Sequence, residues 1–305
     1  MDKNVDHDRL FKELLKTFLV EFLELFFPDV AANIDPLRLH FLDKELFTDV
    51  TRGERHEVDL VVKAAFRGQD THFLIHAEAQ AHRQEHFPSR MFRYFARLHE
   101  DHGLPVYPIA IFSYVSPRKA EPTEYTVKFP DLDVLAFRYR TVQLNRLNWR
   151  DFIRCANPVA SALMARMRIA KKDRPRVKVE CLRLLATLQL NPAKQQLISG
   201  FVDTYLRLQA HELLEFKKET AKLDPQEEIE VLKITTSWKE EGRLEGLLQG
   251  LEPALRLRFG EAGMAFLESL KKEVPLERIE LVVEQMLSAP DLDSLAALAF
   301  PRKKA

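Results

Sequence analysis

One stretch constrains the fold of this chain more than any other: residues 56–80, which read HEVDLVVKAAFRGQDTHFLIHAEAQ. Two mainly apolar runs flank Arg67–Gly68–Gln69–Asp70, and glycine at the first central position of a two-residue loop suits a type II′ hairpin turn. This pattern predicts two antiparallel strands paired around Gly68 and Gln69. Because both faces of each strand carry apolar residues, the two strands are predicted to be central and buried.

The predicted turn fixes which residues face each other. With Gly68 and Gln69 in the centre, residues at equal distances from the turn pair, so Asp59 is predicted to lie directly opposite Glu78. Paired residues have Cβ atoms roughly 4.5–5.5 Å apart and point to one face of the sheet, and Gln80, two residues further on, points to that face too. Lys63 shares the same face by alternation.

Two opposed carboxylates repel each other unless a cation lies nearby. The carboxylates of Asp59 and Glu78, the backbone carbonyl of Ala79 and water form an oxygen ligand set of the kind that Mg²⁺ or Mn²⁺ prefers. The alternative is that both acids lie on a solvated face of the hairpin. Because acids in a buried strand need compensation, the pattern favours a metal site. His76 has the same alternation parity as Glu78 and Gln80. The pattern predicts that His76 either supplies local charge near that site or is simply a polar residue of the strand.

The order Asp59, then Glu78–Ala79–Gln80 on the next strand, resembles the D…(D/E)-x-K signature of the PD-(D/E)XK nuclease superfamily. More narrowly, it resembles the Rpn-type group of recombination-promoting nucleases and putative transposases, which often has Glu-x-Gln at this place. Three further segments resemble motifs of that group in the same order: HDRLFKEL at residues 7–14, SRMFRY at 89–94 and VYPIAI at 106–111. The resemblance covers about residues 6 to 145.

This resemblance implies metal-dependent hydrolysis of DNA phosphodiester bonds, linked to recombination or mobile elements. Asp59 and Glu78 would hold one or two Mg²⁺ or Mn²⁺ ions, which activate a bound water. In the superfamily a lysine stands two residues after the second acid, where this chain has Gln80, a residue that can orient water but carries no charge. Lys63 is a candidate to replace part of that lysine's role. The family also suggests that Glu13, on the first helix, reaches the metal; the alternative is an exposed helical glutamate.

A helix predicted for residues 86–102 carries a second candidate site. Arg90, Arg93, Tyr94 and Arg97 recur at helical spacing, so they are predicted to form one basic face with an aromatic residue. Such a face next to an acidic site can contact DNA phosphates. The alternative is an ordinary exposed face of a helix whose other side packs on the sheet.

The order of predicted elements is helix, strands, helix, strand and further strands, which is typical of an α/β sandwich with a mixed sheet, as in a restriction-endonuclease-like core. This domain is assigned to residues 1–145, a helical extension and linker to 146–250, and a small helical domain to 251–305. The helical C-terminal half is a candidate for homo-oligomerisation. The periodicity predicts these elements: helices at 8–27, 175–192 and 194–217, and strands at 106–115, 124–129 and 133–144.

The charge balance limits what kind of DNA contact is possible. Lys and Arg number 46, as do Asp and Glu, so the net charge is zero and any basic groove must be local. Cys155 and Cys181 form no CxxC pattern, which indicates reduced thiols. Neither a signal peptide nor an apolar run of membrane-spanning length is evident, so we expect a cytoplasmic protein with no membrane contact.

A second function class remains open. The neutral charge and the missing lysine favour a catalytically weak or inactive nuclease-fold module that acts in protein assembly or nucleic-acid binding. A nuclease that cleaves RNA would use the same site.

Overall fold

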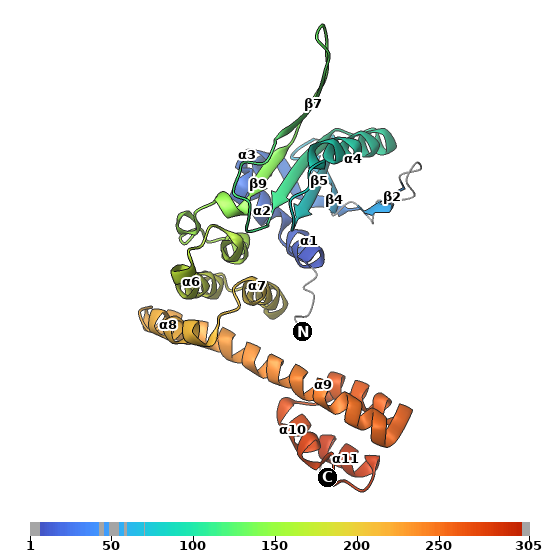
Figure 1. Ribbon diagram of the computed structural model, residues 1–305, viewed down its shortest axis with the longest axis vertical. Coiled ribbons are helices and arrows are strands. Elements are labelled where there is room, and N and C mark those ends of the chain that lie inside the picture. The colour runs from blue at the N-terminus through green and yellow to red at the C-terminus, as the bar shows by residue number, and fades with distance from the viewer. Residues whose placement is uncertain (1–6, 43–45, 49–54, 58–59, 70, 301–305) are drawn as a thin grey trace. The chain divides into compact units, whose positions relative to one another are not determined.

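The computed structural model describes residues 7–42, 46–48, 55–57, 60–69 and 71–300 (Figure 1). The chain divides into two compact units, Met1–Val231 and Leu232–Ala305. Among the described residues, no helix is long and apolar enough to cross a membrane.

A five-stranded mixed sheet forms the centre of the first unit, in the order β1–β4–β5–β6–β9. The strands are β1 (Ile34–Phe41), β4 (Leu60–Phe66), β5 (His72–Gln80), β6 (Val106–Phe112) and β9 (Arg140–Gln143). β1, β4 and β5 pair antiparallel, whereas β6 is parallel to β5 and β9 is parallel to β6. Parallel neighbours need a crossover, and helix α4 (Phe87–His102) provides it between β5 and β6. The predicted mixed α/β sheet is confirmed.

The central hairpin has the predicted register but a different turn. The backbone N–H of Gln69 donates to the carbonyl of Phe66 (3.1 Å), so Arg67 and Gly68 are the central residues and the predicted two-residue type II′ loop is wrong. Gly68 has a φ of 71°, which favours glycine. The register survives because Phe66 N–H donates to Thr71 carbonyl (3.1 Å), so the longer loop is centred on the same point.

Helix α4 covers one face of the sheet. Tyr94 and Leu98 of α4 form a buried cluster with Val61 of β4 and Leu74 of β5. Glu78 lies four residues after Leu74 on the same strand, and alternate residues of a strand share a face. Glu78 therefore points to the side of the sheet that α4 covers.

Helices α1 (His7–Thr17) and α2 (Leu19–Phe26) contact each other and lie over the opposite face. α1 contacts β5, and the ring of Phe27, just after α2, lies 6.3 Å from the ring of Tyr107. Tyr107 pairs with Ile75, whose side chain points away from α4. The sheet is thus enclosed between two helical layers.

The single helix predicted for residues 8–27 is two helices. Phe18 is fully buried and has non-helical dihedrals, φ −132° and ψ 39°, which separate α1 from α2. The two segments have different partners, since α1 contacts α7 (Pro192–Tyr205) and α2 contacts α5 (Pro158–Leu163). The break lets each segment keep its own apolar face on the core. A short helix, α3 (Pro28–Asn33), follows.

Two small sheets accompany the main one. β7 (Glu124–Lys128) and β8 (Asp133–Arg138) form a hairpin that projects from the sheet (Figure 1). The single strand predicted for 133–144 is therefore split: β8 pairs with β7, and β9 returns to pair with β6. β2 (Leu46–Thr48) pairs with β3 (Arg55–Glu57).

After β9 the first unit is helical. Asn157, directly before Pro158, caps α5: its Oδ1 accepts from the N–H groups of Val159 (2.8 Å) and Ala160 (3.3 Å). Its Nδ2 donates to the carbonyl of Glu21 in α2 (2.8 Å). This hydrogen bond joins the helical part of the first unit to the helices that cover the sheet. The other helices of this part are η1 (Leu144–Arg146), η2 (Trp149–Asp151), η3 (Met164–Arg166), η4 (Lys171–Asp173), α6 (Arg174–Thr187), α7 and α8 (Ala210–Thr220).

Helix α8 begins with a capping box. Its carboxylate, Glu212, leads us to expect that the stability of the fold depends on pH. Glu212 accepts from Gln209 N–H (2.8 Å) and from Arg174 Nε (2.9 Å). Burial by itself raises the pKa of Glu212, but these hydrogen bonds outweigh it and the pKa lies below its ordinary value. A carboxylate whose pKa is lowered by folding stabilises the fold above its unfolded-state pKa, and this stabilisation is lost as pH falls through the folded-state pKa.

We therefore expect Glu212→Gln to lower the free energy of unfolding by about 1–2 kcal/mol at neutral pH, and by less at about pH 3. Urea unfolding followed by circular dichroism at both pH values measures this difference. An equal loss at both pH values would contradict the role of the ionised carboxylate.

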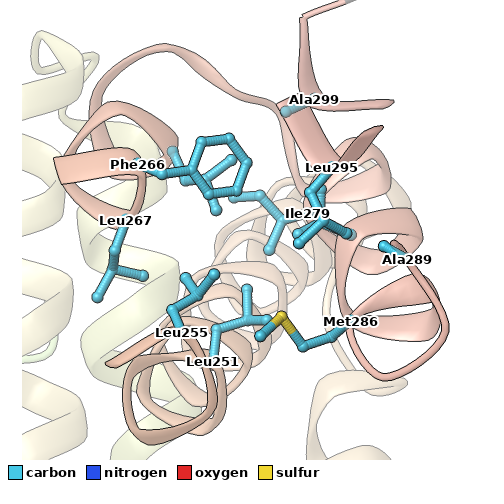
Figure 2. Close-up of a cluster of buried hydrophobic side chains, with 11 residues drawn as sticks. Leu251, Leu255, Phe266, Leu267, Ile279, Met286, Ala289, Leu295 and Ala299 are labelled. Atoms are coloured by element: carbon cyan, nitrogen blue, oxygen red, sulfur yellow. The ribbon is translucent and has the colours of Figure 1, made fainter. Parts of the chain in front are cut away.

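The second unit is a small helical bundle. It contains the C-terminal part of α9 (Pro225–Glu273), α10 (Leu276–Gln285) and α11 (Leu292–Ala299). The backbone leaves the helical conformation at Gly260, where φ is 55° and ψ is −134°, so the chain turns there. Figure 2 shows the side chains of Phe266, Ile279 and Leu295 gathered in the core that the helices enclose.

Candidate functional site

A buried carboxylate lies in the middle strand of the sheet. Glu78 is only 3% exposed, and its neighbours Ala77 and Ala79 are apolar and buried. His76, which is fully buried, places Nε2 3.0 Å from Glu78 Oε1. If Glu78 is ionised, its carboxylate only accepts hydrogen bonds, and the proton of this bond then lies on Nε2 of His76. His76 is thus placed to compensate the charge of Glu78 with a hydrogen bond.

The other ring nitrogen of His76 has no hydrogen-bond partner among the residues that the structure describes. Nδ1 is buried and makes no hydrogen bond, while the ring packs edge-on against Tyr94 with centroids 5.8 Å apart. In a neutral imidazole protonated at Nε2, Nδ1 is a bare acceptor. His76 lies within the core rather than along an exposed phosphate path, and its contact is with the carboxylate of Glu78.

Gln80 occupies the position two residues after Glu78 and is 7% exposed. Its Nε2 donates to the carbonyl of Ala79 (3.2 Å), the oxygen predicted to bind metal. Its own backbone carbonyl accepts from Ser113 N–H (2.9 Å) and Ser113 Oγ (3.2 Å) at the end of β6. The amide that stands in place of the superfamily's lysine is therefore held against the main chain.

Two of the other predicted catalytic residues, Lys63 and Glu13, are not brought to Glu78. Asp59 lies outside the described residues. Lys63 pairs with Leu74, four residues from Glu78, which is about 13 Å along the strand at roughly 3.3 Å per residue. Glu13 is exposed on α1, the helix that lies over the face opposite to Glu78.

Tyr94 belongs to the core and not to an exposed basic face. It is 4% exposed and lies with Met91 and Leu98 on the side of α4 that packs against the sheet. These three residues follow the i, i+3, i+7 spacing of a buried helical stripe. Tyr94 is thus placed with the apolar residues and beside His76, and the guanidinium of Arg90 lies 5.9 Å from its ring centroid.

The three arginines of α4 differ in exposure. Arg93 is exposed, whereas Arg90 and Arg97 are half-buried. Arg90 donates to Gln84 Oε1, and its guanidinium lies 5.3 Å from the ring centroid of Phe87. Its Nε is buried without a hydrogen bond. Arg90 is therefore engaged at the start of its own helix.

The oxygen donors at and beside Glu78 are of the type that binds hard cations. Carboxylate and carbonyl oxygens, as in Glu78 and Ala79, are the ligands that Mg²⁺ and Mn²⁺ prefer. In the part of the chain that the structure describes, no three His, Cys, Asp or Glu side chains are grouped so that they could hold a metal ion. The described donors thus fit the predicted metal in chemistry and need a further acid to complete a site.

A basic surface that the sequence analysis missed lies in the helical part of the first unit. A groove of about 910 Å³ is lined by Lys171, Lys172 and Arg174 among others, and a hollow of about 220 Å³ by Arg118, Arg150 and Arg168 among others. Residues of η4 line both, so we call the two hollows together the basic groove. The signal was present in residues 166–178, RMRIAKKDRPRVK, which contain seven basic residues and one acid.

Comparison of the chain with protein-family models, with curated proteins and with solved structures gave no match. The motif resemblance of residues 59–80 to PD-(D/E)XK nucleases therefore has no support from similarity over the whole chain.

Proposed function

We propose that the first unit is a metal-dependent nuclease domain that hydrolyses phosphodiester bonds in DNA. The observation that carries this proposal is the carboxylate of Glu78, which is buried in the middle strand of the sheet beside the ring of His76. Burying a charge costs free energy that a purely structural strand residue does not incur. Such groups are concentrated at functional sites.

The strand order supports the same proposal. A helix, three antiparallel strands, a crossover helix and a parallel strand follow one another, as the resemblance to a restriction-endonuclease-like core implies. The pairing of β4 with β5 is regular as far as Leu60 and Ala77. Asp59 directly precedes Leu60, and we assign it as the second carboxylate.

In this proposal Glu78, Asp59 and the Ala79 carbonyl hold Mg²⁺ or Mn²⁺. Such an ion polarises a phosphate and lowers the pKa of a bound water. His76 positions the carboxylate of Glu78 through its Nε2 proton. Gln80 orients water or the main chain without adding charge, so the site lacks the cation that the superfamily's lysine supplies.

One observation favours a second candidate, a nuclease-fold module that binds nucleic acid or assembles with other proteins without cleavage. The amide of Gln80 is bonded to the Ala79 carbonyl, and Lys63 lies about 13 Å along the strand. Neither residue supplies a charge at the position of the lysine, which would slow or abolish cleavage.

The test is a nicking assay on supercoiled plasmid with Mg²⁺ or Mn²⁺. The full chain should produce nicked circles with metal and none with EDTA, and Asp59→Ala should be inactive. Asp101→Ala removes an exposed acid from the last turn of α4 and should remain active. Cleavage that persists in EDTA or in Asp59→Ala would overturn the proposed site, and no cleavage by the folded wild type would favour the binding module.

A further inference from the structure

The basic groove contains more cations than carboxylates. Its lining includes six Lys or Arg side chains and three Asp or Glu side chains. Each acid is already paired: Asp173 lies 3.0 Å from Arg150, Glu212 lies 2.9 Å from Arg174, and Glu215 lies 2.7 Å from Lys218. The carboxylates therefore neutralise two of the six lining cations and one lysine outside the groove.

Four cations of the groove remain uncompensated. Arg118, Arg168, Lys171 and Lys172 are exposed, and their side chains make no hydrogen bond or ion pair to any described residue. They come from two segments far apart in sequence: Arg118 lies in the loop after β6, and the other three lie at residues 168–172, which include the start of η4. In a chain of zero net charge, this gathering creates a local positive field that attracts anions.

The groove is connected to the end of the sheet that carries Glu78. Because β5 and β6 are parallel, their carboxyl ends meet at one edge, where ligands of open α/β sheets bind. Ser113, just after β6, bonds to the carbonyl of Gln80, and its own carbonyl accepts a hydrogen bond from Arg166. Arg166 stands two residues before Arg168 in the chain, so the segment that lines the groove is anchored by a hydrogen bond to the residue that follows β6.

We propose that the basic groove binds the phosphate backbone of a nucleic acid through Arg118, Arg168, Lys171 and Lys172. The guanidinium fork of arginine matches phosphate oxygens, and lysine acts as a point charge. Small phosphate ligands are held by convergent donors in enclosed pockets, whereas these four cations are exposed and spread over two hollows, which suits an extended polyanion. The choice of nucleic acid over another polyanion rests in part on the proposed nuclease function.

The inference is tested by binding of the full chain to a fluorescent 30-base-pair DNA duplex in EDTA, where metal-dependent cleavage does not occur. Fluorescence anisotropy over a range of salt concentrations gives the slope of log affinity against log salt, which changes by about 0.9 for each phosphate contact. Lys171→Ala/Lys172→Ala should reduce the slope by about 1.8, and the further changes Arg118→Ala/Arg168→Ala should reduce it by about 3.6 in total. Lys16→Ala/Arg138→Ala removes two exposed cations elsewhere and should leave the slope unchanged.

Three results would overturn the inference: no binding of the duplex by the wild type, the same slope in the fourfold variant, or stronger binding to polyglutamate or anionic vesicles that the duplex does not displace. Single-stranded DNA and duplex RNA in parallel identify which nucleic acid is preferred. Groove-dependent binding without cleavage in the plasmid assay would support the groove and overturn the nuclease. If the fourfold variant cleaves DNA like the wild type and its salt slope is also unchanged, the nuclease is supported and the groove is overturned.

Discussion

Replacing Glu78 by glutamine is expected to reduce metal-dependent DNA cleavage by about three orders of magnitude or more. Charge stabilisation by a catalytic metal contributes several kcal/mol, and each 1.36 kcal/mol is about tenfold in rate. Glutamine has nearly the same shape, and its amide oxygen still accepts the proton that His76 carries on Nε2. The packing of β5 therefore remains while the negative charge needed by the metal is lost.

The stability of this variant separates a functional carboxylate from a structural one. Removing a buried charge relieves its desolvation, so we expect the free energy of unfolding of Glu78→Gln to be unchanged or higher in urea titrations. Glu212→Gln is the matched control, because Glu212 is also buried but accepts from a backbone N–H and from Arg174. That control should lose stability without losing cleavage, because in the lining of the basic groove it removes only a negative charge. Retained cleavage with a large loss of stability in Glu78→Gln would identify Glu78 as structural.

The register of the central hairpin could be predicted because it depends on where the centre of the loop lies and not on the type of turn. The turn type was wrong, yet Leu60 pairs with Ala77 as expected, since the actual loop has the same centre as the predicted one. The burial of both strands could also be predicted from their apolar faces. Which helix covers which face could not, because amphipathicity shows that a helix has a buried side but not where it packs. Glu13 was a candidate for the metal site through the family resemblance alone, and α1, which carries it, lies over the other face.

The basic residues are a second case in which the periodicity of the sequence is not enough to predict where side chains lie. In α4, Tyr94 fits both the basic stripe and the apolar stripe, and burial against Leu74 and Val61 decides for the apolar one. The basic groove has no helical period, because its cations come from a loop, two short 3₁₀ segments and the residues around them. Arg118 joins the run at 166–178 only through folding. A count of charge along the chain would have found that run, but not its partner loop.

Replacing Trp149 by alanine is expected to cause the largest loss of stability, about 3–5 kcal/mol. Trp149 is completely buried and is the largest of the fully buried side chains. The guanidinium of Arg150 lies 4.2 Å from its ring centroid and that of Arg176 lies 5.8 Å away, so the ring also supports cations beside the basic groove. Alanine would leave a cavity that the surrounding helices can only partly fill.

Trp149→Phe is the control that separates packing from polar contacts. The indole Nε1 is buried without a hydrogen bond, so phenylalanine removes an unsatisfied donor while keeping an aromatic ring. We expect it to lose less than half of the stability that alanine loses, in urea unfolding followed by circular dichroism. Because the ring also supports Arg150, which pairs with Asp173 at the groove, the phenylalanine variant should retain the salt slope of DNA binding. Equal losses of stability in the two variants would show that the indole makes a polar contact that the ring alone does not replace.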